Sequence, residues 1–363
     1  MFNLQKLFVY AVSVKRRVRK PYHQQFKEIA GLASGKQRLG ASEYYELGVF
    51  DDAVYPPERK SDCVGWRASH LIDQCLNHPH WRAAANDKVL NYAILKHYGF
   101  PIPETMACYC TDGNFIGGEQ RVQSVEALTG YLRHALTFPV FIKPIHGSYG
   151  RGTYQLDSYD AASGCFVDSH QNMIKFDDLV SACVTQGFHG MLFQKCLKPH
   201  DDVRKLVGSS TSCARVIVAL THSGPKILMA FWKIARAHNI TDNFCMGETG
   251  NLLAWLNKDS GTVERIVTGL WPDGEEVTLH PDTGKTLLSA KLPQWQEATA
   301  MCLSAAGHFP GLKLQHWDVA FCVAGPVLME LNTEADLGVP QYLGRTPFID
   351  QTIKTMMEAA EGG

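Results

Sequence analysis

Two acidic residues and an asparagine in "LKLQHWDVAFCVAGPVLMELN" (residues 312–332) have the types and the spacing of a metal site. If this segment is a β-hairpin whose turn centres on Ala324, Asp318 and Glu330 face each other across the two strands. Asn332 lies two residues further along and shares that face of the hairpin. The hairpin therefore predicts a cluster of three oxygen-bearing side chains.

Two carboxylates opposite each other in an apolar hairpin repel and lose hydration, which is unfavourable unless a cation lies between them. Carboxylate and amide oxygens suit Mg²⁺, which completes its coordination with waters and nucleotide phosphates. Solvated charges on an exposed sheet face, or a general acid and base, are the alternatives. The apolar run "VLMELN" and Trp317 beside Asp318 favour burial, and the asparagine favours metal ligation.

The segment "PVFIKPIHGSYGRGTYQL" (139–156) places Lys143 in a strand and follows it with a loop that contains Ser148, Tyr149 and Gly150. Small residues leave backbone N–H groups open to a phosphate. The loop is neither a Walker A motif, because it lacks Gly-Lys-Ser/Thr, nor a dinucleotide fingerprint, because a strand follows it instead of a helix. A strand, loop and strand can close over a triphosphate as a flap, and a purely structural glycine-rich hairpin is the alternative.

A third stretch, "LFQKCLKPHDD" (192–202), is a strand that ends in polar groups. Gln194 can accept a hydrogen bond from an adenine amino group, and the backbone at Lys195 and Leu197 can contact the ring edge. Asp201 can hold ribose hydroxyls. A solvated loop is the alternative for this stretch alone.

The elements that position these residues follow from hydrophobic periodicity and turn residues. Residues 1 to about 80 read as helical pieces. Asn86 is expected to cap the next helix, whose apolar face is Val89, Leu90, Ala93, Ile94 and Tyr98. Further helices are expected at 124–136, 176–184, 294–309 and 348–360, and strands at 105–110, 139–144, 152–156, 164–168 and 190–197. The runs 212–237 and 251–269 are expected to form one antiparallel sheet.

This order of elements predicts an α+β protein with two lobes around a cleft. We expect an N-terminal helical region at 1–85, a small lobe with the glycine-rich loop at 86–200, and a larger lobe with the metal hairpin at 201–363.

The composition is that of an ordinary globular protein, with 45% apolar and 20% charged residues. A net charge of −1 gives no overall preference for nucleic acid. The eleven cysteines are scattered, and the spacing of Cys108 and Cys110 fits neither a zinc knuckle nor a redox pair. We therefore expect reduced thiols and a cytoplasmic location.

The N-terminus joins the apolar octet "LFVYAVSV" (7–14) to the basic stretch "VKRRVRKPYHQQFK" (14–27). The octet is far shorter than the ~20 residues that span a bilayer. Its basic residues follow rather than precede it, unlike those of a secretory signal. Two interpretations stay open: a docked helix with a solvated basic face, or peripheral contact with an anionic membrane, to which each basic residue contributes ~1 kcal/mol.

Taken together and in this order, the motifs resemble the ATP-grasp superfamily. The resemblance is strongest to its sugar-transfer-associated branch, a relative of glutamate-ligase-like carboxylate–amine ligases, and covers roughly residues 40 to 345. The stretches that carry it are "NDKVLNYAILKHYGFPIPET", "PVFIKPIHGSYGRG", "LFQKCL", "SCARVIV", "DNFCMGETGNLLAWL" and "HWDVAFCVAGPVLMELN".

The resemblance implies ATP and Mg²⁺ as cofactors and gives each candidate residue a role. The residues that it implies for the nucleotide are Lys143 at the α- and β-phosphates, Lys88 as an earlier lysine directed at the nucleotide, Ser148, Tyr149 and Gly150 in the lid, Gln194, Lys195 and Leu197 at adenine, and Asp201 at ribose. Those that it implies for Mg²⁺ are Asp318, Glu330 and Asn332. Arg215 resembles the arginine that meets the transferred phosphoryl group.

The segment "MAFWKIARAHNITDNFCMGETG" (229–250) is interpreted as the wall nearest the phosphoryl and acceptor groups, with Lys233, Arg236 and Asn243 as its candidate catalytic residues. A sheet edge that carries charges is the alternative.

Two positions depart from the family pattern. Gln194 stands where many members carry glutamate, which still leaves an acceptor for adenine. His316 stands where the D-alanine–D-alanine ligases carry an arginine that stabilises the phosphorylated intermediate, so that role passes to Arg215 or Arg236.

The resemblance implies a ligase that joins a small-molecule carboxylate to an amine through an acyl phosphate. The expected substrates are a sugar acid, an amino acid or a small peptide in polysaccharide or specialised-metabolite assembly, with no nucleic-acid partner. The alternatives are a phosphotransferase that acts on a hydroxyl and a nucleotide-binding regulator without turnover.

Overall fold

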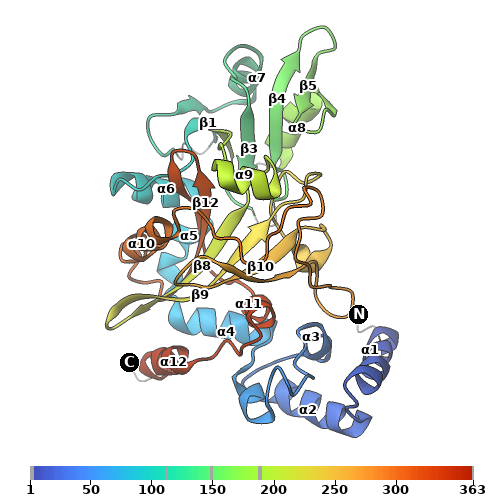
Figure 1. Cartoon of the computed structure of the whole chain (residues 1–363). Helices are drawn as coiled ribbons and strands as arrows, with labels where there is room; N and C mark the ends of the chain where they lie inside the picture. Colours follow the sequence, from blue (N-terminus) through green and yellow to red (C-terminus); the bar gives the residue numbers. More distant parts are fainter. Residues whose placement is uncertain (1–3, 112, 114, 148–149, 187–189, 362–363) are drawn as a thin grey trace.

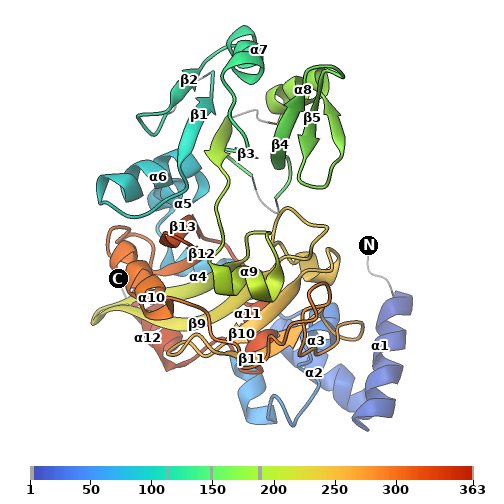
Figure 2. The ribbon, with the colours of Figure 1, turned by 45° about the horizontal axis from the view of Figure 1, so that its top comes forward.

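Two β-sheets with helices packed against them, and a group of N-terminal helices, make up the chain (Figure 1). The computed structural model describes residues 4–111, 113, 115–147, 150–186 and 190–361. A seven-stranded sheet lies at one end of the molecule, a six-stranded sheet lies in the middle, and helices α1 to α3 lie at the other end (Figures 1 and 2). The predicted α+β class is confirmed.

The first sheet has seven strands in the order β2-β1-β7-β3-β4-β5-β6. Its strands are β1 (Thr105–Tyr109), β2 (Gln120–Val122), β3 (Val140–Pro144), β4 (Tyr154–Asp160), β5 (Cys165–Asp168), β6 (Met173–Lys175) and β7 (Met191–Lys195). The β1–β2 pair is parallel and the other pairs are antiparallel. Helices α7 (Val125–His134) and α8 (Phe176–Gln186) contribute Leu128 and Leu179 to its core. The strand, loop and strand predicted around the glycine-rich segment are confirmed as β3 and β4.

The second sheet has six antiparallel strands in the order β11-β10-β9-β8-β12-β13. These are β8 (Cys213–Thr221), β9 (Gly224–Ile234), β10 (Leu252–Leu256), β11 (Val263–Val267), β12 (Leu314–Cys322) and β13 (Gly325–Asn332). Both faces of β8 are buried, because Val216 and Val218 join one core and Ile217 joins the other.

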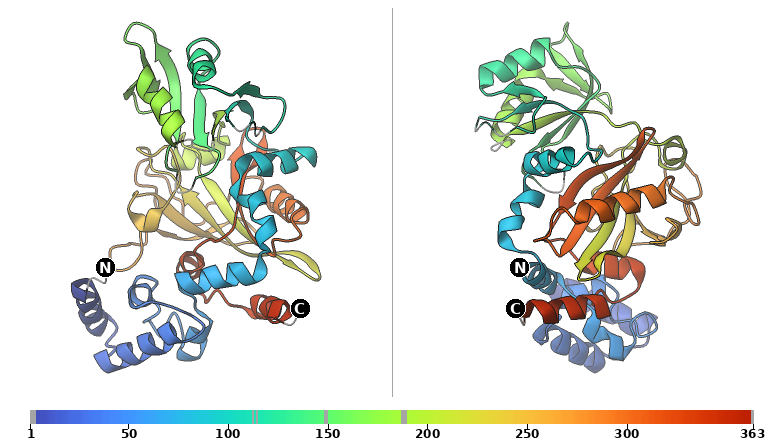
Figure 3. Two further views of the ribbon diagram at one scale, coloured as in Figure 1. Left: turned by 180° about the vertical axis from the view of Figure 1, so that it is seen from behind. Right: turned by 90° about the vertical axis from the view of Figure 1, so that its left-hand side faces the viewer.

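Helices cover both faces of this sheet (Figure 3). Helix α10 (Trp295–Ala306) packs on the face of Val216, while α4 (Trp66–Leu76), α11 (Gly338–Gly344) and α12 (Gln351–Glu361) pack on the face of Ile217. Helix α9 (Asp201–Val207) connects the two sheets.

The remaining helices are α1 (Leu4–Arg17), α2 (Tyr22–Ser34), α3 (Ala41–Glu46), α5 (Ala83–Asn86) and α6 (Lys88–His97), with short 3-10 turns at Pro57–Asp62, Pro79–Trp81 and Cys245–Gly247. Helices α1 to α3 share a core of their own around Tyr44 and Tyr45. Ala84 and Tyr92, from α5 and α6, instead join the core of the six-stranded sheet. The domain limits at residues 85 and 200 stay predictions. Among the described residues, no helix has both the length and the apolar character to cross a membrane.

Helix α6 differs from its prediction in its cap and in its buried face. Asp87, not Asn86, caps it, and its carboxylate accepts hydrogen bonds from the N–H groups of the two residues after Lys88. The helix buries Tyr92 and exposes Tyr98, which was predicted to be apolar and inward-facing. The helix is packed against β13, so tertiary contacts rather than local periodicity select this face.

The hairpin of β12 and β13 pairs Asp318 with Glu330, as the sequence predicts. The pairs Cys322–Gly325 and Val319–Leu328 centre the turn between Val323 and Ala324, half a residue before the predicted centre. The pairing register then shifts between Val319 and Asp318. Met329 is therefore an extra residue in a β-bulge. Without the bulge, Asp318 would oppose Met329, and Glu330 would point to the other face of the sheet.

Candidate functional site

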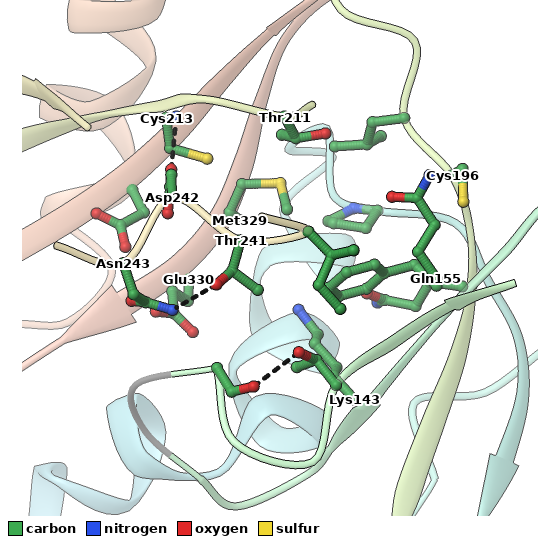
Figure 4. Close-up of a pocket in the computed structure, with 18 of the residues that line it drawn as sticks. Lys143, Gln155, Cys196, Thr211, Cys213, Thr241, Asp242, Asn243, Met329 and Glu330 are labelled. Atoms are coloured by element: carbon green, nitrogen blue, oxygen red, sulfur yellow. Dashed lines mark hydrogen bonds between the residues drawn. The ribbon is translucent and has the colours of Figure 1, made fainter. Parts of the chain in front are cut away.

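A pocket lies between the two sheets and is lined by residues of both (Figure 4). The predicted site residues in its wall are Lys88, Lys143, Gly150, Gln194, Lys195, Leu197, Lys233, Asn243, Asp318 and Glu330. Arg215 and Asn332 lie just behind this wall, where each donates a hydrogen bond to Asp318. Ser148 and Tyr149 lie outside the described residues.

Asp318 forms the most buried ion pairs of the pocket. Its side chain is 2% exposed and accepts two hydrogen bonds from Arg215, from Nε at 2.8 Å and from Nη2 at 2.7 Å. Lys233 Nζ donates a third at 3.0 Å. Burial favours the neutral acid, but Arg215 and Lys233 outweigh it and hold the pKa of Asp318 well below its usual range. Asp318 is therefore a carboxylate at neutral pH.

These contacts correct one step of the sequence argument. The two facing carboxylates were expected to need a metal ion as their cation. Arg215 and Lys233 already neutralise Asp318, so the ion pairs alone account for its burial. The case for a metal therefore rests on the chemistry of the donor set.

That donor set consists of two carboxylates and an amide. Asn332 Nδ2 lies 3.2 Å from Glu330 Oε1 and 3.4 Å from Asp318 Oδ2, so this amide contacts both carboxylates. Among the described residues, no group of three or more His, Cys, Asp or Glu side chains is placed to hold a metal. A site with so few oxygen ligands from the protein fits Mg²⁺, which usually binds one or two carboxylates and fills its other coordination positions with water and phosphate.

Lys233 is held by two carboxylates, and one of them was missed from the sequence. Its ammonium lies 3.0 Å from Asp318 Oδ2 and 3.0 Å from Asp242 Oδ1. Asp242 also accepts the backbone N–H of Cys213 at 2.7 Å, which joins β8 to this wall of the pocket. The position of Asp242 directly before Asn243, in the segment already chosen as a wall, was the signal available in the sequence.

Lys143 lies in the pocket with a partner that the sequence did not indicate. Its Nζ donates to Tyr92 Oη at 2.8 Å and sits 5.3 Å from the centre of that ring. Burial lowers the pKa of Lys143, and Glu330 opposes that shift. An anion beside this ammonium would favour its charged form, as a nucleotide phosphate would. The contact of Tyr92 with Lys143 could not be predicted from the sequence, because tertiary packing selects the face of the helix that Tyr92 occupies.

The other end of the pocket carries the residues predicted for adenine. Gln194 is buried, and its Nε2 donates to Thr105 Oγ1 at 3.1 Å. The Lys195 N–H donates to Glu104 O at 2.9 Å, and the Lys195 ammonium pairs with the Glu104 carboxylate. The edge of an adenine ring would therefore have to form its hydrogen bonds with the Lys195 carbonyl or the Leu197 N–H.

Two predicted residues do not reach the pocket. Asp201 begins α9 with its side chain 62% exposed, and it pairs with Arg204 one helical turn away. Arg236 pairs with Asp282, which accepts from its Nε and Nη2. Neither residue is in the wall of the pocket as described. Each of the two side chains forms an ion pair, with Arg204 or Asp282, that the sequence pattern did not identify.

Gly150 packs the glycine-rich loop against the wall formed by Thr241 and Asn243. Its φ is +67°, and a Cβ added there would lie 2.7 Å from Asn243 Nδ2. Gly164 has the same φ but has open space where its Cβ would be. Gly150→Ala should therefore hinder contact between the loop and the wall, whereas Gly164→Ala should only strain the backbone.

We expect Gly150→Ala to raise the apparent Kd for Mg-ATP roughly tenfold, about 1.4 kcal/mol, and Gly164→Ala to leave it unchanged. Calorimetric titration of both variants measures this difference. Equal nucleotide affinity in the two variants would show that the loop does not close against Asn243 when nucleotide binds.

His316 is neutral and therefore cannot supply the positive charge that an arginine provides in the D-alanine–D-alanine ligases. It is 1% exposed, and its Nδ1 has no hydrogen-bond partner within the described part of the chain. Burial, with a smaller contribution from Arg215, lowers its pKa to about 3. Of the two arginines predicted to take that role, Arg215 pairs with Asp318, whereas Arg236 pairs with Asp282.

The neutral His316 predicts a pH dependence of stability. Below pH 6.5 the unfolded chain protonates this imidazole, while the folded chain does not until about pH 3. The unfolded state then binds more protons, so the free energy of unfolding decreases as the pH is lowered. This group contributes at most about 1.4 kcal/mol per pH unit to that decrease. Urea unfolding at neutral pH and at about pH 5 should show a smaller loss for His316→Gln than for the wild type. Equal losses would mean that His316 is protonated in the folded state.

Comparisons with known proteins now identify the class of this fold and site. Residues 67–353 match the family of sugar-transfer associated ATP-grasp proteins. The match covers more than half of the chain, and the chain therefore belongs to this family and has the ATP-grasp fold. The family resemblance predicted from the motifs is confirmed. The search of curated proteins found no match.

Solved structures show a distant similarity. The ATP-grasp ligase PsnB in complex with its minimal precursor is 16% identical, with 79% of this chain and 63% of PsnB covered and a TM-score of 0.40. The biotin carboxylase domain of the Hydrogenobacter thermophilus 2-oxoglutarate carboxylase, with MgADP, is 13% identical, with 82% and 51% covered and a TM-score of 0.43. The L-amino acid ligase from Bacillus licheniformis is 10% identical, with 77% and 49% covered and a TM-score of 0.40. The chain spans roughly half to two thirds of the length of these proteins.

Proposed function

We propose that this protein is an ATP-dependent ligase that joins a carboxylate to an amine through an acyl phosphate. The observation that carries the proposal is the alternation of charge at the inner end of the pocket. Lys143 and Lys233 lie there with the carboxylates Asp318 and Glu330, and Arg215 lies directly behind them. Such a site can neutralise a polyphosphate and a metal ion together.

In the proposed reaction, a carboxylate oxygen of the substrate attacks the γ-phosphorus of ATP, and the bond to the ADP oxygen breaks. The amine nitrogen then attacks the acyl carbon, phosphate leaves, and the nitrogen loses its proton. Lys143 and Lys88 hold phosphate oxygens, and Arg215, behind the wall, holds Asp318 in position and adds positive charge near the transferred group. Mg²⁺, bound by Asp318, Glu330 and Asn332, would supply further charge compensation for the phosphates.

This scheme needs no nucleophile from the protein, and the two thiols in the pocket wall support that. Cys196 and Cys213 line the pocket, but burial raises the pKa of Cys196 to about 12 and that of Cys213 far above the usual range for a thiol. A protonated thiol is a poor nucleophile. Positioning and charge compensation are therefore the chemistry that the pocket can supply.

We infer that the acid is a sugar acid, an amino acid or a small peptide in polysaccharide or specialised-metabolite biosynthesis. The description of the family as sugar-transfer associated supports this inference. We place the reaction in the cytoplasm, where ATP is available.

The test incubates the protein with Mg-ATP, a panel of sugar acids and amino acids, and hydroxylamine. An acyl phosphate would be trapped as a hydroxamate in step with ADP release, and Lys143→Met should yield neither. Lys258→Met, whose lysine pairs with Asp259 at the surface and lies outside the pocket wall, is the control that should keep both. ADP release without hydroxamate for every acid would favour phosphoryl transfer to a hydroxyl, and no effect of Mg-ATP on the melting temperature would contradict any ATP-dependent function.

A further inference from the structure

The first two helices leave large apolar side chains in solvent. Phe8 on α1 is 69% exposed and Phe26 on α2 is 75% exposed, and Leu4, Val9 and Tyr22 are also exposed. Isolated apolar side chains are normal on protein surfaces, whereas several within two adjacent helices mark a contact surface.

Each of the two helices carries an exposed apolar stripe. Leu4 and Phe8 are four residues apart on α1, and Tyr22 and Phe26 are four residues apart on α2, so each pair shares one face of its helix. The ammonium of Lys15, at the end of α1, lies 4.5 Å from the centre of the Tyr22 ring. This contact joins the two faces.

The opposite face of α1 is already used to hold the helix on the protein. Tyr10 and Val14 are buried, and the Tyr10 ring packs against Tyr45 and Trp271. The exposed stripe is therefore not the docking face of the helix. Of the two interpretations open from the sequence, a docked helix with a solvated basic face does not account for exposed Phe8.

The charge of this segment has one sign. Residues 4–27 contain seven basic residues and no acidic one, although the whole chain has a net charge of −1. Lys6 pairs with Glu46, and Lys20 is buried against Glu28 and Asp52. The others, which are exposed, are Lys15, Arg16, Arg17, Arg19 and Lys27.

We propose that the exposed faces of α1 and α2 dock on an anionic membrane surface. Basic side chains contact lipid phosphates, and the aromatic and aliphatic side chains beside them enter the interface of the bilayer. A second copy of the chain fits the surface less well, because a two-fold contact brings each patch against itself and places like charges together.

The place of these helices in the molecule is compatible with an active docked enzyme. Helices α1 and α2 lie at the opposite end from α7 and β4 (Figures 1 and 3). A membrane at α1 and α2 would therefore leave the seven-stranded sheet, which carries the glycine-rich loop, in solution.

The experiment is flotation of the full chain with vesicles of phosphatidylcholine alone and with vesicles that also contain phosphatidylglycerol. We expect binding to the anionic vesicles, lost at high salt. Arg16→Glu with Arg17→Glu should weaken it by roughly thirtyfold or more, since two surface basic residues are removed. Arg204→Glu with Lys205→Glu, an exposed basic pair on α9, is the matched control and should bind like the wild type.

The apolar part of the surface is tested by Phe8→Ser with Phe26→Ser, against Met173→Ser, which changes an exposed residue of β6. The first variant should lose most vesicle binding and keep the wild-type melting temperature, and the second should keep both. Absence of wild-type binding to anionic vesicles, or equal binding by the Arg16/Arg17 variant, would overturn the proposal. A dimer that depends on Phe8, without vesicle binding, would assign the surface to self-association instead.

Discussion

Glu330→Gln is expected to lose ATP turnover by roughly 100-fold or more, because even residues that only support a metal ligand typically change activity 10- to 100-fold. The substitution keeps the shape of the side chain and its contact with Asn332, but it removes the negative charge proposed to hold Mg²⁺. The Glu330 side chain is 31% exposed, so the change should leave the melting temperature near that of the wild type. Steady-state ADP release and thermal unfolding measure the two effects.

Glu264→Gln is the matched control for this variant. Glu264 also accepts a hydrogen bond from an asparagine, Asn257, and lies on the edge strand β11 of the same sheet. It should keep wild-type turnover. Wild-type turnover in Glu330→Gln would contradict the metal assignment, and a collapse of its melting temperature would make Glu330 a structural residue.

Asp318→Asn should lose both stability and activity. The carboxylate is the shared partner of Arg215 and Lys233, and all three side chains are largely buried. Removing one member of a buried ion pair leaves an uncompensated charge, which typically costs about 3–5 kcal/mol of unfolding free energy. Turnover should be lost as well, because Asp318 is a proposed metal ligand.

The pair of Arg236 and Asp282 provides the comparison for Asp318→Asn. The geometry is similar, but the Asp282 side chain is 23% exposed. Asp282→Asn should therefore lose only about 0–1 kcal/mol, as surface ion pairs do. Urea unfolding of both variants tests the contrast, and equal losses would mean that burial does not decide the energetics of the Asp318 cluster.

Part of this site could be predicted because it depends on short-range pattern. Alternation along a hairpin places Asp318 opposite Glu330, and the structure confirms that pair. The pairing register on which that prediction depended was incomplete, because the sequence has no signal for the bulge at Met329. The bulge also turns both Met329 and Glu330 toward the pocket.

The residues that the sequence missed depend on contacts between distant elements. Tyr92 reaches Lys143 only because α6 packs on β13, and its own helix pattern suggested another face. Arg236 was expected in the pocket and lies instead with Asp282, which is 46 residues away in the chain. Charge partners of this kind follow from the tertiary fold rather than from motif spacing.

The most direct test of the proposed reaction follows an oxygen atom. Once an acid that supports ADP release is known, it is labelled with ¹⁸O in both carboxylate oxygens and incubated with Mg-ATP and the amine. An acyl phosphate intermediate leaves one labelled oxygen in each inorganic phosphate, which mass spectrometry detects. Unlabelled inorganic phosphate, or phosphate that stays bonded to the acid, would contradict the proposed ligase reaction.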